Sequence, residues 1–239
     1  MSAFNVYKLD TMPKLAAAVL TITCISLAGC SNTVGTFIDA MKVALNPGEG
    51  VTLTNEQLAR RTKDALYVTV GDLPRAQLAL DKTEHGQDKW RSADKAFLVM
   101  EQGRIVKTAG FSNDLLFVTN TAKDPLKQPM SKIQQGQQWQ SYTDWLQKQE
   151  TGYKVTYEIV ETSTEKIQLL EQQFDTKKVT EHVSFASGET ATNLFWFDLT
   201  SGVLLKSRQQ ISPFWPEVEL VHISNAARLA GIAKAGVSQ

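Results

Sequence analysis

Hydrophobic and polar residues alternate along much of the chain, most clearly at residues 75–81 and 153–159. Successive side chains of a strand point to opposite faces, so a period of two is typical of strands with one buried and one wet face. Turn-forming residues interrupt the alternation at short intervals, which indicates hairpin connections. We therefore expect about a dozen strands between Leu66 and Ile223 and a mainly β fold. Its expected form is a large antiparallel meander, curled as a half-barrel or folded as a sandwich.

Short helices are expected to flank the sheet. Thr54 and Gln57 have the spacing of a capping box, in which each side chain satisfies a backbone N–H of the other, and they predict a helix that ends near Asp64. Residues 224–234 are rich in helix-forming alanine and predict a second short helix.

Residues 131–149 carry two conflicting signals. The glutamines there are compatible with a helix, whereas Trp139, Ser141, Thr143 and Trp145 lie at strand spacing. We favour a strand that starts at Gln137 and follows a short turn or helix.

The N-terminal segment has the layout of a secretory signal. Lys14 precedes an apolar run, Leu15 to Leu27, and small residues follow it. A helix of that length rises only about 20 Å, too short for a permanent transmembrane helix. Met1 and Met12 both remain open as the start of translation.

Leu27, Ala28, Gly29 and Cys30 are similar to a bacterial lipobox, the cleavage signal whose cysteine receives a lipid. Cys24 is a poor alternative, because a β-branched residue precedes it where a small one is needed. The competing interpretation is that Cys30 is an ordinary buried cysteine, which the small and apolar flanking residues disfavour. We therefore predict lipidation of Cys30, with Leu27, Ala28 and Gly29 as the cleavage signal.

Removal of the leader leaves 210 of the 239 residues, with 23 basic and 24 acidic side chains. A balanced charge gives no electrostatic reason to bind nucleic acid or anionic lipid. Membrane attachment is then expected from the lipid, since each buried methylene contributes about 0.8 kcal/mol and two or three acyl chains anchor durably. Cys30 is then the only cysteine left in the mature chain, so no disulfide is expected.

The expected organisation follows from these boundaries: a lipoprotein signal peptide (1–29), a lipidated tether (30–53), a β domain (54–223) with possible halves (66–120 and 137–223), and a C-terminal tail (224–239). The halves are suggested by an echo between residues 96–108 and 194–207. A chance likeness of two apolar hairpins explains the echo equally simply, and we favour it.

Motifs of known chemistry are missing from the sequence. His85, His182 and His222 have no metal-ligand spacing, and no P-loop, GxSxG or GxGxxG is present. Five acidic residues lie at expected turns or strand ends, where carboxylates are usually solvated: Asp94, Glu101, Asp114, Asp198 and Glu217. We expect no metal, no cofactor and no enzymatic activity.

Tryptophans are the more suggestive residues, because the indole ring stacks on sugar faces as well as filling cores. Trp196 lies within an apolar run and is expected in the core. Trp215 lies between Pro213 and Pro216, which favours an exposed sheet edge. We take Trp90 and Trp215 as candidate contacts for a polysaccharide or a protein partner.

Four stretches together resemble the YjbF/GfcB family of lipoproteins: LYVTVGDLPRAQLAL (66–80), WRSAD (90–94), GRIVKTAGFSNDL (103–115) and FDLTSGVLLKSRQQISP (197–213). The resemblance implies an outer-membrane lipoprotein of capsule or exopolysaccharide gene clusters, acting with polysaccharide or export-machinery proteins. It also implies that Cys30 bears the lipid. Ser31, the residue after it, matches the pattern of lipoproteins that are sorted to the outer membrane. The tail after Ile223 extends beyond the resemblance.

Three functions are compatible with these features. A non-enzymatic accessory predicts an exposed groove around Trp90 and Trp215 and no buried pair of carboxylates. A polysaccharide-modifying hydrolase predicts two acidic residues that face each other across a groove. A carrier of a lipid-linked ligand predicts a cavity inside a curled sheet.

Overall fold

The computed structural model describes residues 50–111, 113–146 and 151–233. The predicted lipidation site and cleavage signal, Leu27 to Cys30, lie outside the described residues. The strands of the described region, in chain order, are β1 (Ala65–Val70), β2 (Ala76–Glu84), β3 (Gln87–Arg91), β4 (Phe97–Glu101), β5 (Arg104–Ala109), β6 (Leu115–Val118), β7 (Gln138–Trp145), β8 (Tyr153–Leu169), β9 (Gln172–Phe185), β10 (Thr190–Asp198), β11 (Leu204–Gln209) and β12 (Val218–Val221).

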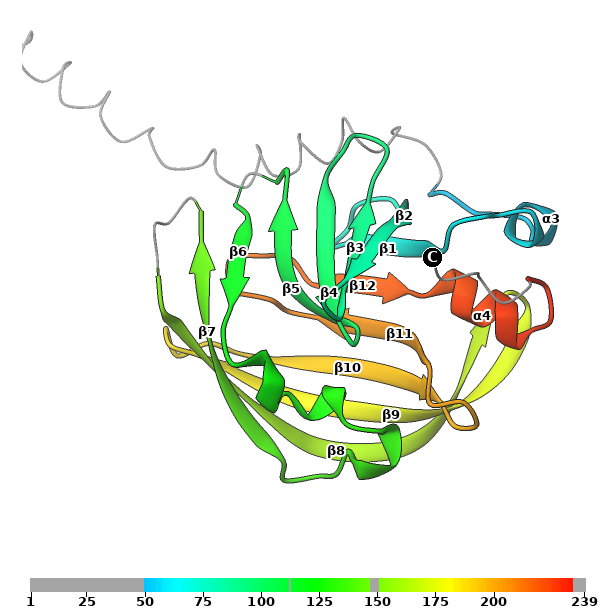
Figure 1. Ribbon diagram of the computed structural model, residues 1–239. Helices are drawn as coiled ribbons and strands as arrows, with labels where there is room; N and C mark the ends of the chain where they lie inside the picture. Colours follow the sequence, from blue (N-terminus) through cyan, green and yellow to red (C-terminus); the bar gives the residue numbers. More distant parts are fainter. Residues whose placement is uncertain (1–49, 112, 147–150, 234–239) are drawn as a thin grey trace, which may run out of the picture. The chain divides into compact units, whose positions relative to one another are not determined.

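All of these strands belong to one antiparallel sheet (Figure 1). Strands that follow each other in the chain pair with each other, except β5 and β6, which do not. In addition β1 pairs with β12, with Tyr67 opposite Val221. This closing pair moves the two sheet edges to β5 and β6, which lie next to each other. The sheet is therefore a nearly closed barrel with one seam, and the expected mainly β, curled meander is confirmed.

Side chains bridge the seam in place of a strand ladder. The Thr108 hydroxyl on β5 accepts a hydrogen bond from the Leu115 backbone N–H on β6, with 2.8 Å between the two atoms. The same hydroxyl donates to Asp114 Oδ1 at 2.9 Å. Because a hydroxyl both donates and accepts, one threonine satisfies groups that a ladder would otherwise pair.

Large apolar side chains fill the interior of the sheet. Trp90, Trp139, Trp145 and Trp215 belong to one buried cluster together with aliphatic residues of most strands. Alternation places these residues on the inner face, as the sequence pattern predicts for a half-buried sheet.

The connection between β6 and β7 packs onto the sheet through three short 3-10 helices, η1 (Thr121–Lys123), η2 (Pro125–Lys127) and η3 (Met130–Lys132). Its Leu126 and Ile133 are buried against Val179 and Phe195 of β9 and β10. The preference for a strand over a helix in residues 131–149 is confirmed, because β7 follows these turns.

In the described part of the chain, two α-helices flank the sheet, α3 (Asn55–Ala59) and α4 (Ile223–Leu229). The Thr54–Gln57 capping box is present, with both reciprocal hydrogen bonds formed, although α3 ends earlier than expected. The predicted C-terminal helix is α4, which packs with α3 on the outer face of β1 through Ala227, Leu58 and Tyr67. Neither helix is long and apolar enough to span a membrane, nor is any other helix in the described residues.

The two possible halves of the domain share this single sheet. Residues 66–120 carry β1 to β6, and residues 137–223 carry β7 to β12. The echoing segments form the hairpins β4–β5 and β10–β11. Two similar halves remain one hypothesis for this echo, beside the chance likeness that we favour.

Candidate functional site

A charged cluster lies inside the sheet, centred on Arg104. The hairpin between β4 and β5 turns at Gln102 and Gly103, which have φ of 47° and 86°. Two successive residues with positive φ form the tight hairpin turn that matches strand twist. Arg104 follows this turn as the first residue of β5, with 3% of its surface exposed.

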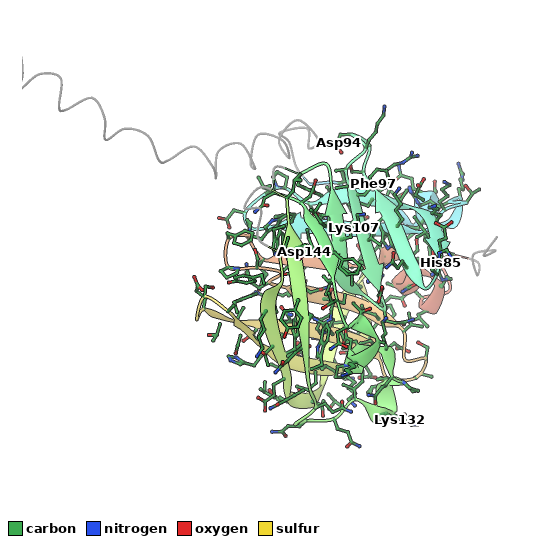
Figure 2. The ribbon with its side chains drawn as sticks, turned by 60° about the vertical axis from the view of Figure 1, so that its left-hand side comes forward. His85, Asp94, Phe97, Lys107, Lys132 and Asp144 are labelled. Atoms are coloured by element: carbon green, nitrogen blue, oxygen red, sulfur yellow. The ribbon has the colours of Figure 1, made fainter. Side chains whose placement is uncertain are left out.

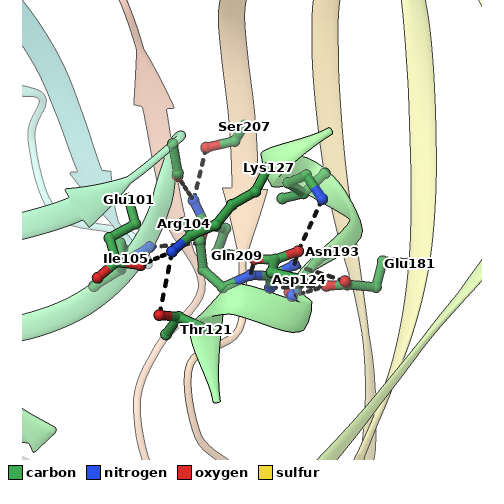
Figure 3. A network of polar contacts seen from close by, with 12 residues as sticks. Glu101, Arg104, Ile105, Thr121, Asp124, Lys127, Glu181, Asn193, Ser207 and Gln209 are labelled. Carbon is green, nitrogen blue, oxygen red and sulfur yellow. Dashed lines mark hydrogen bonds and ion pairs between the residues drawn. The ribbon is translucent and has the colours of Figure 1, made fainter. Parts of the chain in front are cut away.

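Two carboxylates from different elements form ion pairs with the Arg104 guanidinium (Figure 3). Glu181, on β9, accepts from Nη1 at 3.0 Å and from Nη2 at 2.7 Å. Asp124, which caps η2, accepts from Nε at Oδ2 and from Nη2 at Oδ1, 3.2 Å away. Both pairs are bidentate, the strongest arrangement for an arginine and a carboxylate.

Neutral hydrogen-bond donors also contact the two carboxylates. The Asn193 amide on β10 donates to Glu181 Oε2 at 2.9 Å, and the Leu126 backbone N–H donates to Asp124 Oδ1 at 3.0 Å. One cation thus faces two buried anions, and dipolar groups take up the excess negative charge. Removing charge from water is costly, so such a cluster persists only when its partners are well satisfied.

Aromatic rings surround the same guanidinium. Its Cζ lies 5.0, 4.7 and 5.4 Å from the ring centroids of Trp139, Tyr157 and Phe195. Burial opposes the charge of Arg104, but Asp124 and Glu181 outweigh this effect and hold its pKa well above the usual value. Burial also raises the pKa of Tyr157 to about 12. The arginine is therefore permanently charged and the tyrosine neutral at physiological pH.

Gln209, on β11, links the cluster to the tip of the β4–β5 hairpin. Its amide nitrogen donates to the Gly103 carbonyl at 2.7 Å, and its amide oxygen accepts from the Ile105 N–H at 3.1 Å. A side-chain amide has the same donor and acceptor as a backbone peptide, so Gln209 pairs with β5 as a strand would. Beside it is a cavity lined by Arg104, Leu115 and Tyr157, with room for about one water molecule.

The geometry of the cluster suits a structural clamp. Asp124 and Glu181 are 2% and 0% exposed, and both are held by the same cation. A general acid or base must reach its substrate and exchange a proton with it. The cluster as it stands can orient strands and resist opening of the seam, whereas it offers no reachable carboxylate.

Two expectations about acidic residues are wrong. A pair of carboxylates is buried, since Asp124 and Glu181 share Arg104. Glu101, Asp114 and Asp198 are also buried rather than solvated, because each carboxylate accepts hydrogen bonds from other groups of the protein.

Those three residues have partners for their carboxylates, local ones in the case of Asp114 and Asp198. Asp114 accepts from the Gly110 and Phe111 N–H groups, and Asp198 accepts from Ser201. Burial alone would raise the pKa of Glu101, but hydrogen bonds from Lys127 and Gln87 outweigh it and lower that pKa. Asp94 is exposed and Glu217 is half-buried, closer to what the sequence suggests.

The expected exposure of the candidate tryptophans is also wrong. Trp90 and Trp215 are 4% and 3% exposed. The turn around Pro213 and Pro216 directs the Trp215 indole inward, where its Nε1 donates to the Asn113 carbonyl at 2.9 Å. Trp196 is buried, as expected. The tryptophans predicted to contact a partner therefore belong to the core.

The three histidines lie apart in the fold. His85 is in the β2–β3 turn, His182 is on β9, and His222 caps α4 next to Trp90, with 6.1 Å between the ring centroids. Burial lowers the pKa of His222 to about 4. Within the described ranges, no three metal-ligating side chains gather at one place.

Comparison with known sequences gives a match over residues 38–223 to the family described as group 4 capsule polysaccharide lipoprotein GfcB, YjbF. The chain is 26% identical over 212 residues to the uncharacterized lipoprotein GfcB of Escherichia coli K12, which covers 87% of this chain and 98% of the relative. It is 27% identical over 193 residues to the uncharacterized lipoprotein YjbF of the same organism, covering 80% and 90%.

A solved structure has the same fold. The crystal structure of the hypothetical lipoprotein YmcC from Escherichia coli K12 superposes with a TM-score of 0.65 at 24% sequence identity. The superposition covers 77% of this chain and 92% of the other. At that identity the likeness supports the architecture alone.

Proposed function

This chain belongs to the YjbF family of group 4 capsule polysaccharide lipoproteins, and on that basis we propose that it is a non-enzymatic accessory in secretion or assembly of a capsular or extracellular polysaccharide. It acts as an outer-membrane lipoprotein, anchored by acyl chains on Cys30 and facing the periplasm. Its partners are the polysaccharide or proteins of the export machinery. The family match over residues 38–223 is the observation that carries this proposal.

The leader supports the proposed location. An apolar run of signal-peptide length ends at Leu27-Ala28-Gly29-Cys30, and Ser31 follows. Two or three acyl chains hold a protein on a bilayer without any transmembrane helix.

The interior of the domain supports a role without catalysis. The buried carboxylates of Asp124 and Glu181 are ion-paired with Arg104, and the cavity beside them has room for about one water molecule. A glycosidase needs two carboxylates several ångströms apart with a sugar between them. The hydrolase hypothesis therefore gains no support from this cluster.

The carrier hypothesis is similarly weakened by packing. Tryptophan, leucine and valine side chains of one continuous cluster occupy the inner face of the sheet. A lipid-linked ligand would have to displace these side chains, at the cost of the apolar contacts that hold the sheet curled.

The proposal is tested by deleting the gene and measuring surface polysaccharide, with complementation by the wild type and by Cys30→Ser. We expect deletion to reduce surface polysaccharide, the wild type to restore it, and Cys30→Ser to fail because the domain is no longer at the membrane. Affinity purification of the acylated protein should recover export proteins or sugar polymer. Normal surface polysaccharide in the deletion strain, with neither partner recovered, would contradict the proposal.

A further inference from the structure

Four apolar side chains are exposed on the outer face of β6, β7 and the residue that follows β7. Leu116, Phe117, Tyr142 and Leu146 are 39%, 57%, 45% and 51% exposed. They lie on neighbouring strands beside the seam, and we call them the seam patch. Apolar side chains gathered on one surface often mark a contact with a membrane or another molecule.

The sheet geometry places this patch outward. Leu115 and Val118 are buried inside, and the pairing of β6 with β7 shifts by one residue between Leu115 and Phe117. This irregularity leaves Leu116 and Phe117 exposed in succession, where ordinary alternation would turn one of them inward. The patch is therefore a consequence of the bulge at the seam.

Lysines flank the patch on both sides. Lys154 on β8 lies opposite Tyr142, and Lys107 is exposed on β5 across the seam. Figure 2 shows Lys107 and Asp144 on the same face of the domain. Neither lysine forms an ion pair with a described residue, whereas Asp144 accepts a hydrogen bond from the Gly152 N–H at 2.8 Å. Asp144 lies opposite Phe117 within the patch, so the two lysines are opposed by one hydrogen-bonded carboxylate. Apolar side chains with two unpaired cations at the rim fit the interface of an anionic bilayer.

The patch extends to the end of the sheet where the chain enters. Val51 donates its N–H to the Arg75 carbonyl beside the β1–β2 turn, at 2.9 Å. Antiparallel order brings the β7–β8 connection, which follows Leu146, to that same end. Cys30 precedes Gly50 by 20 residues, a length that reaches at most about 70 Å. A lipid on Cys30 therefore leaves this end free to touch the bilayer.

We propose that the seam patch rests on the surface of a bilayer containing anionic lipids, as a second contact besides the lipid on Cys30. This inference rests on the membrane anchoring in the proposed function and adds the orientation of the domain. A bilayer fits better than a glycan, because the leucine and phenylalanine side chains have no group to hydrogen-bond with sugar hydroxyls. The lysines supply charge for lipid phosphates at the rim.

The mature acylated protein has no free thiol, so one cysteine can report the contact. Two single-cysteine variants, Phe117→Cys and the control Val203→Cys, are labelled with a polarity-sensitive fluorophore. Val203 lies at the opposite end of the sheet and is 37% exposed in the wild type. Both proteins are reconstituted in vesicles of phosphatidylethanolamine and phosphatidylglycerol. We expect a blue shift and protection from an aqueous quencher at position 117, with neither at position 203. Equal accessibility of the two labels would overturn the proposal.

The lysine rim is tested in the labelled Phe117→Cys protein with Lys107→Gln and Lys154→Gln added. Each lysine lost should shift the equilibrium between docked and undocked domain about five-fold toward undocked. Protection that survives both changes, or that arises only when polygalacturonate is added to the vesicles, would overturn the bilayer contact. The polysaccharide phenotype of the deletion strain is a separate result, so the failure of either proposal is recognisable by itself.

Discussion

Arg104 and Glu181 lie 77 positions apart in the sequence and are joined by two hydrogen bonds inside the sheet. β5 forms one side of the seam, and β9 lies across the interior from it. The pair, completed by Asp124, therefore connects the seam edge to the opposite part of the sheet. This connection explains how a sheet with an open seam keeps its curled form.

Replacing the cation should cost far more stability than replacing one anion. Arg104→Met leaves two buried carboxylates without a counterion and is expected to lower the free energy of unfolding by about 3–5 kcal/mol. Glu181→Gln leaves one balanced ion pair and should cost about 1–2 kcal/mol. Urea denaturation measures both values. Lys166→Met, in the exposed Lys166–Asp175 pair, is the control and should change little.

The amide of Gln209 should be needed for the β4–β5 hairpin tip. Gln209→Leu leaves the Gly103 carbonyl and the Ile105 N–H without their partner, and buried unpaired groups cost about 1–3 kcal/mol. Gln138→Leu, at an exposed position on β7, makes the same chemical change on the surface. Equal unfolding free energies for the two variants would show that the bridge contributes nothing.

Gly103 is constrained by both its backbone and its surroundings. It has φ of +86°, and a Cβ placed on it would lie 2.1 Å from Leu204 Cδ2. Gly188 has φ of +97° and no heavy atom within 4 Å of such a Cβ. Both alanine variants should suffer backbone strain, about 1–3 kcal/mol. Gly103→Ala should cost about 1 kcal/mol more, because Leu204 must leave its rotamer.

A double variant separates these two causes for Gly103. If the contact with Leu204 causes the extra cost, that cost should vanish when Leu204 is already alanine. In the Leu204→Ala protein, Gly103→Ala should then lower the free energy of unfolding no more than Gly188→Ala does in the wild type. Additive effects of Gly103→Ala and Leu204→Ala would place the cost in the backbone alone.

His222 should make the protein less stable as the pH falls. Its pKa is lowered from 6.5 to about 4, chiefly by burial. Between these values the unfolded chain binds a proton that the folded protein excludes, so stability is present above pH 6.5 and is lost toward pH 4. The expected loss is about 3 kcal/mol.

The pH dependence of unfolding in urea measures this effect. His222→Phe keeps a ring beside Trp90 and removes the titration, and His222 makes no side-chain capping bond to lose. The variant should flatten the curve between pH 6.5 and 4. His182→Gln, outside the core, is the control, and an unchanged slope in His222→Phe would refute the assignment.

The sequence pattern predicts the local elements well because their causes are local. The alternation in residues 153–159 becomes part of β8, and the Thr54–Gln57 capping box starts α3. The closure of β1 on β12 is a pairing of distant segments, for which a single sequence carries no register signal.

The charged cluster could be predicted only in part. Glu181 shares a strand face with Val179 and Val183, so a charge on an apolar face was the available signal. Its partners are 77 and 12 residues away, and no local pattern identifies them. The exposure predicted for Trp215 is wrong because flanking prolines indicate a turn but not the direction of the side chain between them.

The mass of the protein extracted from membranes tests the central claim most directly. The account predicts a chain that begins at Cys30, carries a diacylglyceryl thioether and lacks residues 1–29. A chain with a free thiol at Cys30, or with the leader still attached, would contradict the anchoring on which the proposed function depends.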